Sequence, residues 1–146
     1  MKLNLDCVRD ILLCVEDNTG YRKLASFVDI DQCEQTSKAL GCEPPKVWPY
    51  QNKLMESYSN HELMYHFKFC IDANLIDVDE HFGSQQFFVL DLTPLGHETI
   101  SNLRSPTAFE RIKSLANKIG VESLPGICQL ASGVMSQIIQ NHLSHS

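Results

Sequence analysis

Apolar residues recur at helical spacing near the start of the chain. The apolar side chains between Leu5 and Val15 would share one face of a helix, with charged residues on the other side. Asn18 and Gly20 follow, and these residue types commonly end helices. The pattern predicts a first helix over residues 4–17.

The stretch from about 21 to 53 has a less regular pattern. Its apolar positions favour a strand over Leu24–Ile30 and a short helix over Cys33–Leu40, ended by Gly41. Three prolines then follow within a few residues, and proline restricts both itself and the preceding residue. We therefore expect an extended path through Trp48 and an irregular insertion over the whole stretch.

The clearest helix begins after Ser59. Ser59 and Glu62 have the spacing of a capping box, and Tyr58 and Leu63 stand at the positions of a hydrophobic staple. Asn74 is suited to the left-handed conformation that ends many helices. Between these signals lies an inward-facing stripe of Leu63, Met64, Phe67, Cys70 and Ile71.

The second half of the chain alternates turn and capping signals. Apolar segments at 75–79 and 87–92 surround a polar turn and predict a β-hairpin. Thr93–Pro94 and Ser105–Pro106 each place a capping residue before a proline, which predicts two helices. The second of these would turn Phe109, Ile112, Ala116 and Ile119 inward and end at Gly120. A last helix is predicted over residues 123–142.

This order of elements predicts an α+β, mostly helical fold with a winged-helix-like core. The core would span residues 1–104, with the insertion at about 21–53 and the hairpin as its wing. Residues 105–146 would form a C-terminal helical appendage within one compact domain. A partner helix just before Tyr58 is the piece that the pattern does not show.

The net charge and its distribution along the chain disfavour some classes of function. The net charge is −6, and residues 1–100 carry 8 basic against 16 acidic side chains. An acidic body disfavours broad contact with phosphates. Residues 101–146 carry 4 basic against 2 acidic side chains, which leaves one candidate nucleic-acid patch. Its members are Arg104, Arg111, Lys113 and Lys118. No apolar run approaches the ~20 residues of a membrane span, and the first residues resemble no signal peptide, so we expect a cytoplasmic protein.

Motifs for catalysis or metal binding are not recognisable. The six cysteines include no C-x-x-C pair, so we interpret them as structural. His66 and Cys70 share a helix face, but two ligands do not make a metal site. The chain has neither a nucleophile elbow nor a glycine-rich phosphate loop. We expect no enzymatic activity, no metal and no cofactor.

Four segments carry a resemblance to a known family: MKLNLDCVRDILL, YSNHELMYHFKFCIDANLI, LDLTPLGHETISNLR and, more loosely, FERIKSLANKIG. They are similar to the bacterial and phage family DUF2513, a domain of unknown function, and together cover about half of the chain. Asn74 stands where the family favours glycine. The resemblance implies a winged-helix-like core and a protein of phage or prophage type. It implies no activity and transfers no site residues.

Two surfaces are candidates for partner binding. The outer face of the clearest helix carries His61, Tyr65, Lys68 and Phe69, which suit a protein contact because aromatic residues are enriched in interfaces. The alternative is that the C-terminal helices cover these rings. The last helix carries an apolar stripe that would pack on its own core or form a homodimer. Its candidate dimer residues are Ile127, Leu130, Val134, Met135 and Ile138.

The first hypothesis is therefore a non-enzymatic regulatory or adaptor protein that acts through protein–protein contacts. The partner protein is unknown, and the family resemblance adds the narrower version of an inhibitor of a host protein. The alternative is a dimeric winged-helix transcriptional regulator that binds DNA through Lys68 and the basic patch. The acidic hairpin, with Asp77, Asp79 and Glu80, disfavours that alternative because it would repel phosphates. No membrane binding is expected, since the polar face of the last helix lacks Lys and Arg.

Overall fold

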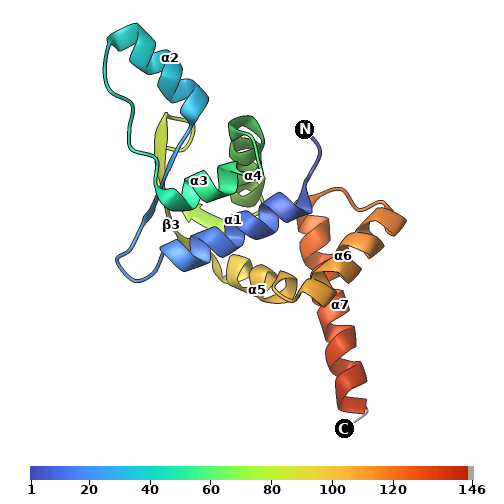
Figure 1. Ribbon diagram of the computed structural model, residues 1–146. Coiled ribbons are helices and arrows are strands. Elements are labelled where there is room, and N and C mark those ends of the chain that lie inside the picture. The colour runs from blue at the N-terminus through green and yellow to red at the C-terminus, as the bar shows by residue number, and fades with distance from the viewer. Residues whose placement is uncertain (145–146) are drawn as a thin grey trace.

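The computed structural model describes residues 1–144, which form seven helices and one three-stranded sheet (Figure 1). The fold is α+β and mostly helical. In chain order the elements are α1 (Leu5–Asn18), β1 (Ala25–Val28), α2 (Ile30–Leu40), α3 (Pro49–Met55), α4 (Asn60–Asp72), β2 (Ile76–Val78), β3 (Gln86–Leu92), α5 (Pro94–Leu103), α6 (Pro106–Ile119) and α7 (Leu124–Ser144).

The sheet is antiparallel and has the strand order β1-β3-β2. Ala25 pairs with Val89 on one side of β3, and Ile76 pairs with Leu92 on the other. The predicted hairpin is confirmed as β2 and β3, with an irregular register next to Asp77. The sheet thus joins a strand from the first quarter of the chain to the hairpin that follows α4.

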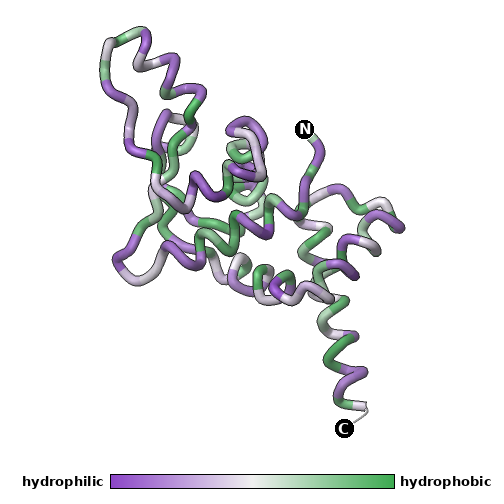
Figure 2. The backbone as a smooth tube through the Cα atoms, viewed as in Figure 1, coloured by the Kyte–Doolittle hydropathy of each residue, from purple (hydrophilic) through white to green (hydrophobic). Residues whose placement is uncertain are grey.

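The core lies where α1 and α4 meet the sheet. Phe27, Phe67 and Phe87 come from β1, α4 and β3 and are almost fully buried. The ring centroid of Phe67 lies 4.6 Å from that of Phe27 and 5.3 Å from that of Phe87. Rings in such tilted and edge-on contacts stabilise each other beyond simple burial. Figure 2 shows hydrophobic positions gathered along this inner side of α1, α4 and the sheet.

The predicted helix starts are confirmed in their caps. The side chains of Ser59, Thr93 and Ser105 each accept a hydrogen bond from a backbone N–H in the first turn of α4, α5 and α6. Asn74 has a φ of 59°, the left-handed conformation that the sequence predicted. The reciprocal half of the capping box is absent from the described contacts, because the Glu62 carboxylate accepts instead from the Asn4 side chain at 2.9 Å.

The region 21–53 contains regular elements, so the expected irregular insertion is wrong, and β1 and α2 confirm the predicted strand and short helix. The extended path through Trp48 is confirmed, since Trp48 has an extended backbone (φ −78°, ψ 152°), but it ends there because α3 begins at Pro49. Pro49 occupies the first turn of α3, where its missing N–H costs nothing. Two side chains of α3 then bond the outer edge of β1. The Tyr50 hydroxyl accepts from the Ser26 N–H at 2.7 Å, and the buried Gln51 amide both accepts from and donates to the Val28 backbone, at 2.9 and 2.7 Å. Because these bonds occupy the edge, α3 replaces a fourth strand.

Helix α7 packs on the body through its first part only. Leu124, Ile127, Ala131 and Val134 are buried against α5 and α6, whereas the later part of α7 projects away from the molecule (Figure 1). Ile119, predicted to face inward, is 64% exposed because it stands in the last turn of α6, beyond the buried face. Within the described residues, none of the helices has both the length and the apolar character of a membrane span.

Candidate protein-interaction surface

The outer face of α4 carries a ladder of aromatic rings, which we call the α4 ladder: His61, Tyr65 and Phe69. Successive ring centroids lie 5.2 and 5.8 Å apart. These residues are one helical turn apart, so the helix geometry alone aligns them. His61 and Tyr65 are exposed, and Phe69 is half-buried. The structure therefore brings three of the four predicted interaction residues together.

The fourth predicted residue, Lys68, lies beside the ladder on the same helix. Its ammonium group contacts the Asp72 carboxylate at 2.8 Å, and this hydrogen bond raises the pKa of Lys68. Both side chains are more than half exposed, so the pair adds little stability. Its consequence for binding is larger, because the positive charge of α4 is already matched by a carboxylate one turn away.

The C-terminal helices leave the start of the ladder exposed. Tyr65 keeps 39% of its surface in solvent. Near Phe69, by contrast, the start of α7 and the N-terminal residues approach α4 without filling the space between them. The alternative in which these helices cover the aromatic rings is thus wrong for Tyr65.

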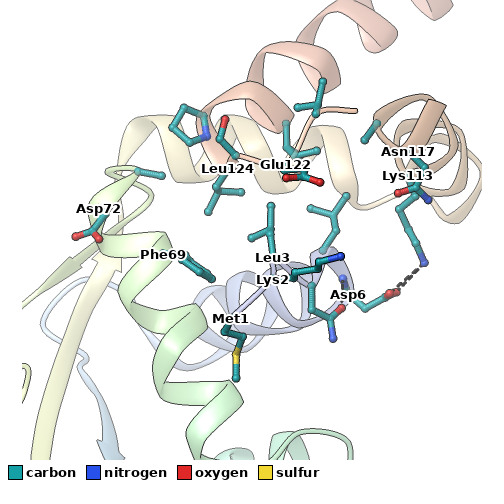
Figure 3. Close-up of a pocket in the computed structure, with 18 residues that line it drawn as sticks. Met1, Lys2, Leu3, Asp6, Phe69, Asp72, Lys113, Asn117, Glu122 and Leu124 are labelled. Carbon is teal, nitrogen blue, oxygen red and sulfur yellow. Dashed lines mark hydrogen bonds and ion pairs between the residues drawn. The ribbon is translucent and has the colours of Figure 1, made fainter. Parts of the chain in front are cut away.

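A groove of about 840 Å³ opens beside Phe69. Its walls come from residues 1–6, the end of α4, the end of α6 and the first turn of α7. Leu3, Phe69 and Leu124 extend toward the same space in Figure 3, and charged side chains stand around the rim. The apolar members of the lining are Met1, Leu3, Leu5, Phe69, Ala73, Ala116, Val121, Leu124, Pro125 and Ile127. The groove therefore has an apolar lining and a polar rim.

The wall formed by residues 1–4 is held to α4 by His66. The fully buried His66 ring accepts from the Asn4 N–H through Nε2 at 2.8 Å, and its Nδ1 lies 2.8 Å from the Glu62 carbonyl oxygen. An acceptor Nε2 places the ring proton on Nδ1, so Nδ1 donates to that carbonyl. The Asn4 side chain also caps α1 by accepting from the N–H of Asp6. The N-terminal residues, α1 and α4 thus meet at Asn4.

The same contacts explain why His66 and Cys70 do not form a metal site. Both nitrogens of His66 are occupied by backbone groups. Cys70 is fully buried, and burial raises the pKa of its thiol. Within residues 1–144 there is no group of three potential ligands close enough to hold a metal ion.

Ion pairs with acidic residues of α1 neutralise part of the predicted basic patch. Arg104 contacts the Glu16 carboxylate at 2.7 Å, and its hydrogen bond lowers the pKa of Glu16. Lys113 contacts Asp6 at 3.0 Å. Arg111 and Lys118 are exposed on α6. Two of the four predicted cations are therefore matched by carboxylates, and the patch is weaker than the sequence indicates.

The turn of the hairpin is acidic and packed against α2. The Asp79 carboxylate accepts from the N–H of Phe88 and contacts His81 Nδ1 at 2.7 Å, which raises the pKa of His81. The start of α2 reaches the same turn, because the Asp29 N–H donates to the Gln85 carbonyl at 2.8 Å and the Gln32 side chain donates to the Gly83 carbonyl. The hairpin tip is thus braced by the insertion.

The predicted dimer stripe is split between core and surface. Ile127 and Val134 are 2% and 4% exposed and belong to the protomer's own core, which removes them from any dimer surface. Leu130, Met135 and Ile138 are half-buried. The sequence of α7 alone does not show which of these residues are buried, because that depends on how far α5 and α6 extend along the helix.

The groove residues outside α4 were missed by sequence reasoning. Leu3 precedes the first helix, and Val121 and Leu124 surround a loop, so no periodic pattern links them to Phe69. The one available signal was Asn4, a residue type that favours helix N-caps. It marks where α1 begins, but the direction of the preceding residues depends on the buried His66.

Comparison with known protein families shows which family the chain resembles. A family model described as "Hypothetical protein (DUF2513)" matches residues 2–122, which include α1 to α6 and the whole sheet. No curated protein and no solved structure matches the chain. The α4 ladder lies inside the matched region, and α7 lies beyond it. The chain therefore belongs to the DUF2513 family.

Proposed function

We propose that this protein is a non-enzymatic regulatory or adaptor protein that binds another protein through the α4 ladder and the adjoining groove. The observation that carries the proposal is the position of Phe69. Its ring contacts the Tyr65 ring edge-on and also lines the groove. The ladder and the groove therefore form one continuous surface.

The chemistry of this surface suits a protein partner. Aromatic side chains that are exposed at one end and packed at the other are typical of interface cores. The groove has the volume of a site that takes a small ligand or an apolar side chain of a partner. The partner would cover Tyr65 and insert an apolar residue beside Leu3 and Phe69.

The order of elements supports a winged-helix-like core for this function. Without α2, the chain runs α1-β1-α3-α4-β2-β3 with strand order β1-β3-β2, which is the arrangement of that fold. Helix α3 supplies the partner helix that the sequence did not show. In this arrangement α4 takes the position of the helix that enters the major groove in DNA-binding members. We propose that here it faces a protein, in the cytoplasm, and the phage-type resemblance favours a host protein that it inhibits.

Affinity capture from the native host tests this proposal with a matched pair of variants. Tyr65→Ala removes an exposed ring of the ladder, and Tyr21→Ala removes a ring that is 91% exposed in the loop between α1 and β1. The wild type and Tyr21→Ala should recover the same partner, and Tyr65→Ala should recover it at least ~10-fold less, as expected for an interface aromatic. Equal recovery by all three proteins would contradict the proposed surface.

A second candidate, a DNA-binding regulator, is favoured by the same element order. Its cations would be the exposed Arg111 and Lys118. Lys68 is matched by Asp72, and Arg104 and Lys113 are matched by acidic residues of α1. A mobility shift with random duplex DNA at low salt tests it, because phosphate contacts are strongest there. Binding that weakens steeply with salt and is lost in Arg111→Ala/Lys118→Ala would support DNA binding and overturn the adaptor proposal.

A further inference from the structure

The projecting part of α7 has an apolar stripe that its own protomer covers only in part. The later part of α7 leaves the body (Figure 1). Met135 and Ile138 are half-buried there, with Ile138 still packed against the core, and Ile139 is 54% exposed. Met135, Ile138 and Ile139 continue the helical stripe that begins with the buried Ile127 and Val134. Figure 2 shows hydrophobic positions recurring along this projecting part. The stripe therefore extends beyond the core that uses its first half.

The same helix carries no Lys, Arg, Asp or Glu from Ser123 to Ser144, in a chain that is 21% charged. The side chains flanking the exposed stripe are hydroxyls and amides, such as Ser136 and Asn141. Across a two-fold axis only the residues near the axis meet their own copies, so a charged residue there would meet a like charge. Amides and hydroxyls both donate and accept, and they can bond to their own copies.

These features determine which occupant fits. A membrane surface would require basic residues on the polar face, and α7 has none. A partner recognised by its charge would find no counter-charge on this helix. A second copy of the chain brings the same neutral, self-complementary stripe.

We infer that the projecting part of α7 pairs with the same part of α7 in a second copy, in antiparallel orientation and crossing near Ile139. The orientation follows from the body of the protein. Because α5 and α6 cover the first half of α7, a parallel pair would force the two bodies into the same space, whereas an antiparallel pair places them at opposite ends. The dimer surface lies apart from the α4 ladder, so this inference does not depend on the proposed function.

Sedimentation velocity of the full chain at low and high concentration tests the pairing. Ile139→Asp places a charge in the stripe, and Gln137→Asp places the same charge on the opposite side of the helix. The wild type and Gln137→Asp should sediment as dimers, and the dissociation constant of Ile139→Asp should rise at least ~10-fold. Ile139→Ser serves as a milder variant, and circular dichroism confirms that each variant is folded.

Two results would overturn the inference. One is a wild type that remains monomeric at high concentration. The other is a dimer that Ile139→Asp and Ile139→Ser leave intact, since its interface would then lie elsewhere.

Cysteine cross-linking tests the orientation in a Cys42→Ser background, which removes the exposed native thiol. Ile139→Cys stands near the proposed axis and should form an intermolecular disulfide. Ser132→Cys lies two turns earlier, so an antiparallel pair separates its two copies by roughly 20 Å, using 1.5 Å per residue. Cross-linking at both positions would indicate a parallel pair, and cross-linking at neither would exclude this helix from the interface.

Discussion

The two faces of α4 differ in their burial and in the contacts that their side chains make. The inner face consists of Leu63, His66, Phe67 and Cys70, all fully buried. The outer face consists of the α4 ladder and Lys68. His61, Tyr65 and Lys68 contact neighbours on the same helix, and Phe69 also packs against the edge of the core. The inner face therefore accounts for folding. The exposed rings of the outer face, His61 and Tyr65, contribute little to it, and the proposed role in binding would account for their position.

The largest effect should come from Phe67→Ala on the inner face. The substitution removes the ring between Phe27 and Phe87 and leaves a cavity in the middle of the core. We expect the free energy of unfolding to fall by about 3–5 kcal/mol, as for other buried aromatic residues. Urea denaturation measures this directly. A loss below about 1 kcal/mol, the range of mild substitutions, would mean that this cluster does not form the core.

A smaller effect is expected from His66→Ala on the same face. The variant leaves the Asn4 N–H without its acceptor, and a buried donor left unsatisfied costs about 1–3 kcal/mol. Hydrogen exchange should also become faster at Asn4 and in the first turn of α1, because this bond holds the wall of the groove. Unchanged exchange at these amides would show that His66 does not hold residues 1–4.

The smallest effect on stability is expected from Tyr65→Ala on the outer face. Surface substitutions away from caps and cores usually change the free energy of unfolding by less than about 0.5 kcal/mol. The same variant should lose the partner, so this one substitution would abolish binding while leaving the free energy of unfolding nearly unchanged. A stability loss comparable to that of His66→Ala would indicate that Tyr65 belongs to the core.

The sequence predicts elements well where a local signal decides them. The start of α4 follows from Ser59, and the start of α5 from Thr93 and Pro94, because a cap bonds only within its own first turn. Helix α3 was missed because its important polar residue, Gln51, is buried against β1 rather than exposed. In a seven-residue helix one such position hides the amphipathic pattern.

The candidate site was predicted only in part, for a related reason. The ladder residues lie one turn apart on one helix, so their spacing in the sequence was enough to group them. The ion pairs of Arg104 with Glu16 and of Lys113 with Asp6 join positions far apart in the chain. Their effect on the basic patch depends on how α1 packs against α5 and α6, which no local pattern contains.

Site-specific photo-crosslinking in the native host tests the central claim most directly. A photoreactive residue replaces Tyr65 on the ladder in one protein and Tyr21, in the loop between α1 and β1, in another. The account predicts a cross-link from position 65 to one protein, with no such product from position 21. Cross-links from position 65 to DNA, or a protein cross-link from position 21 alone, would contradict it.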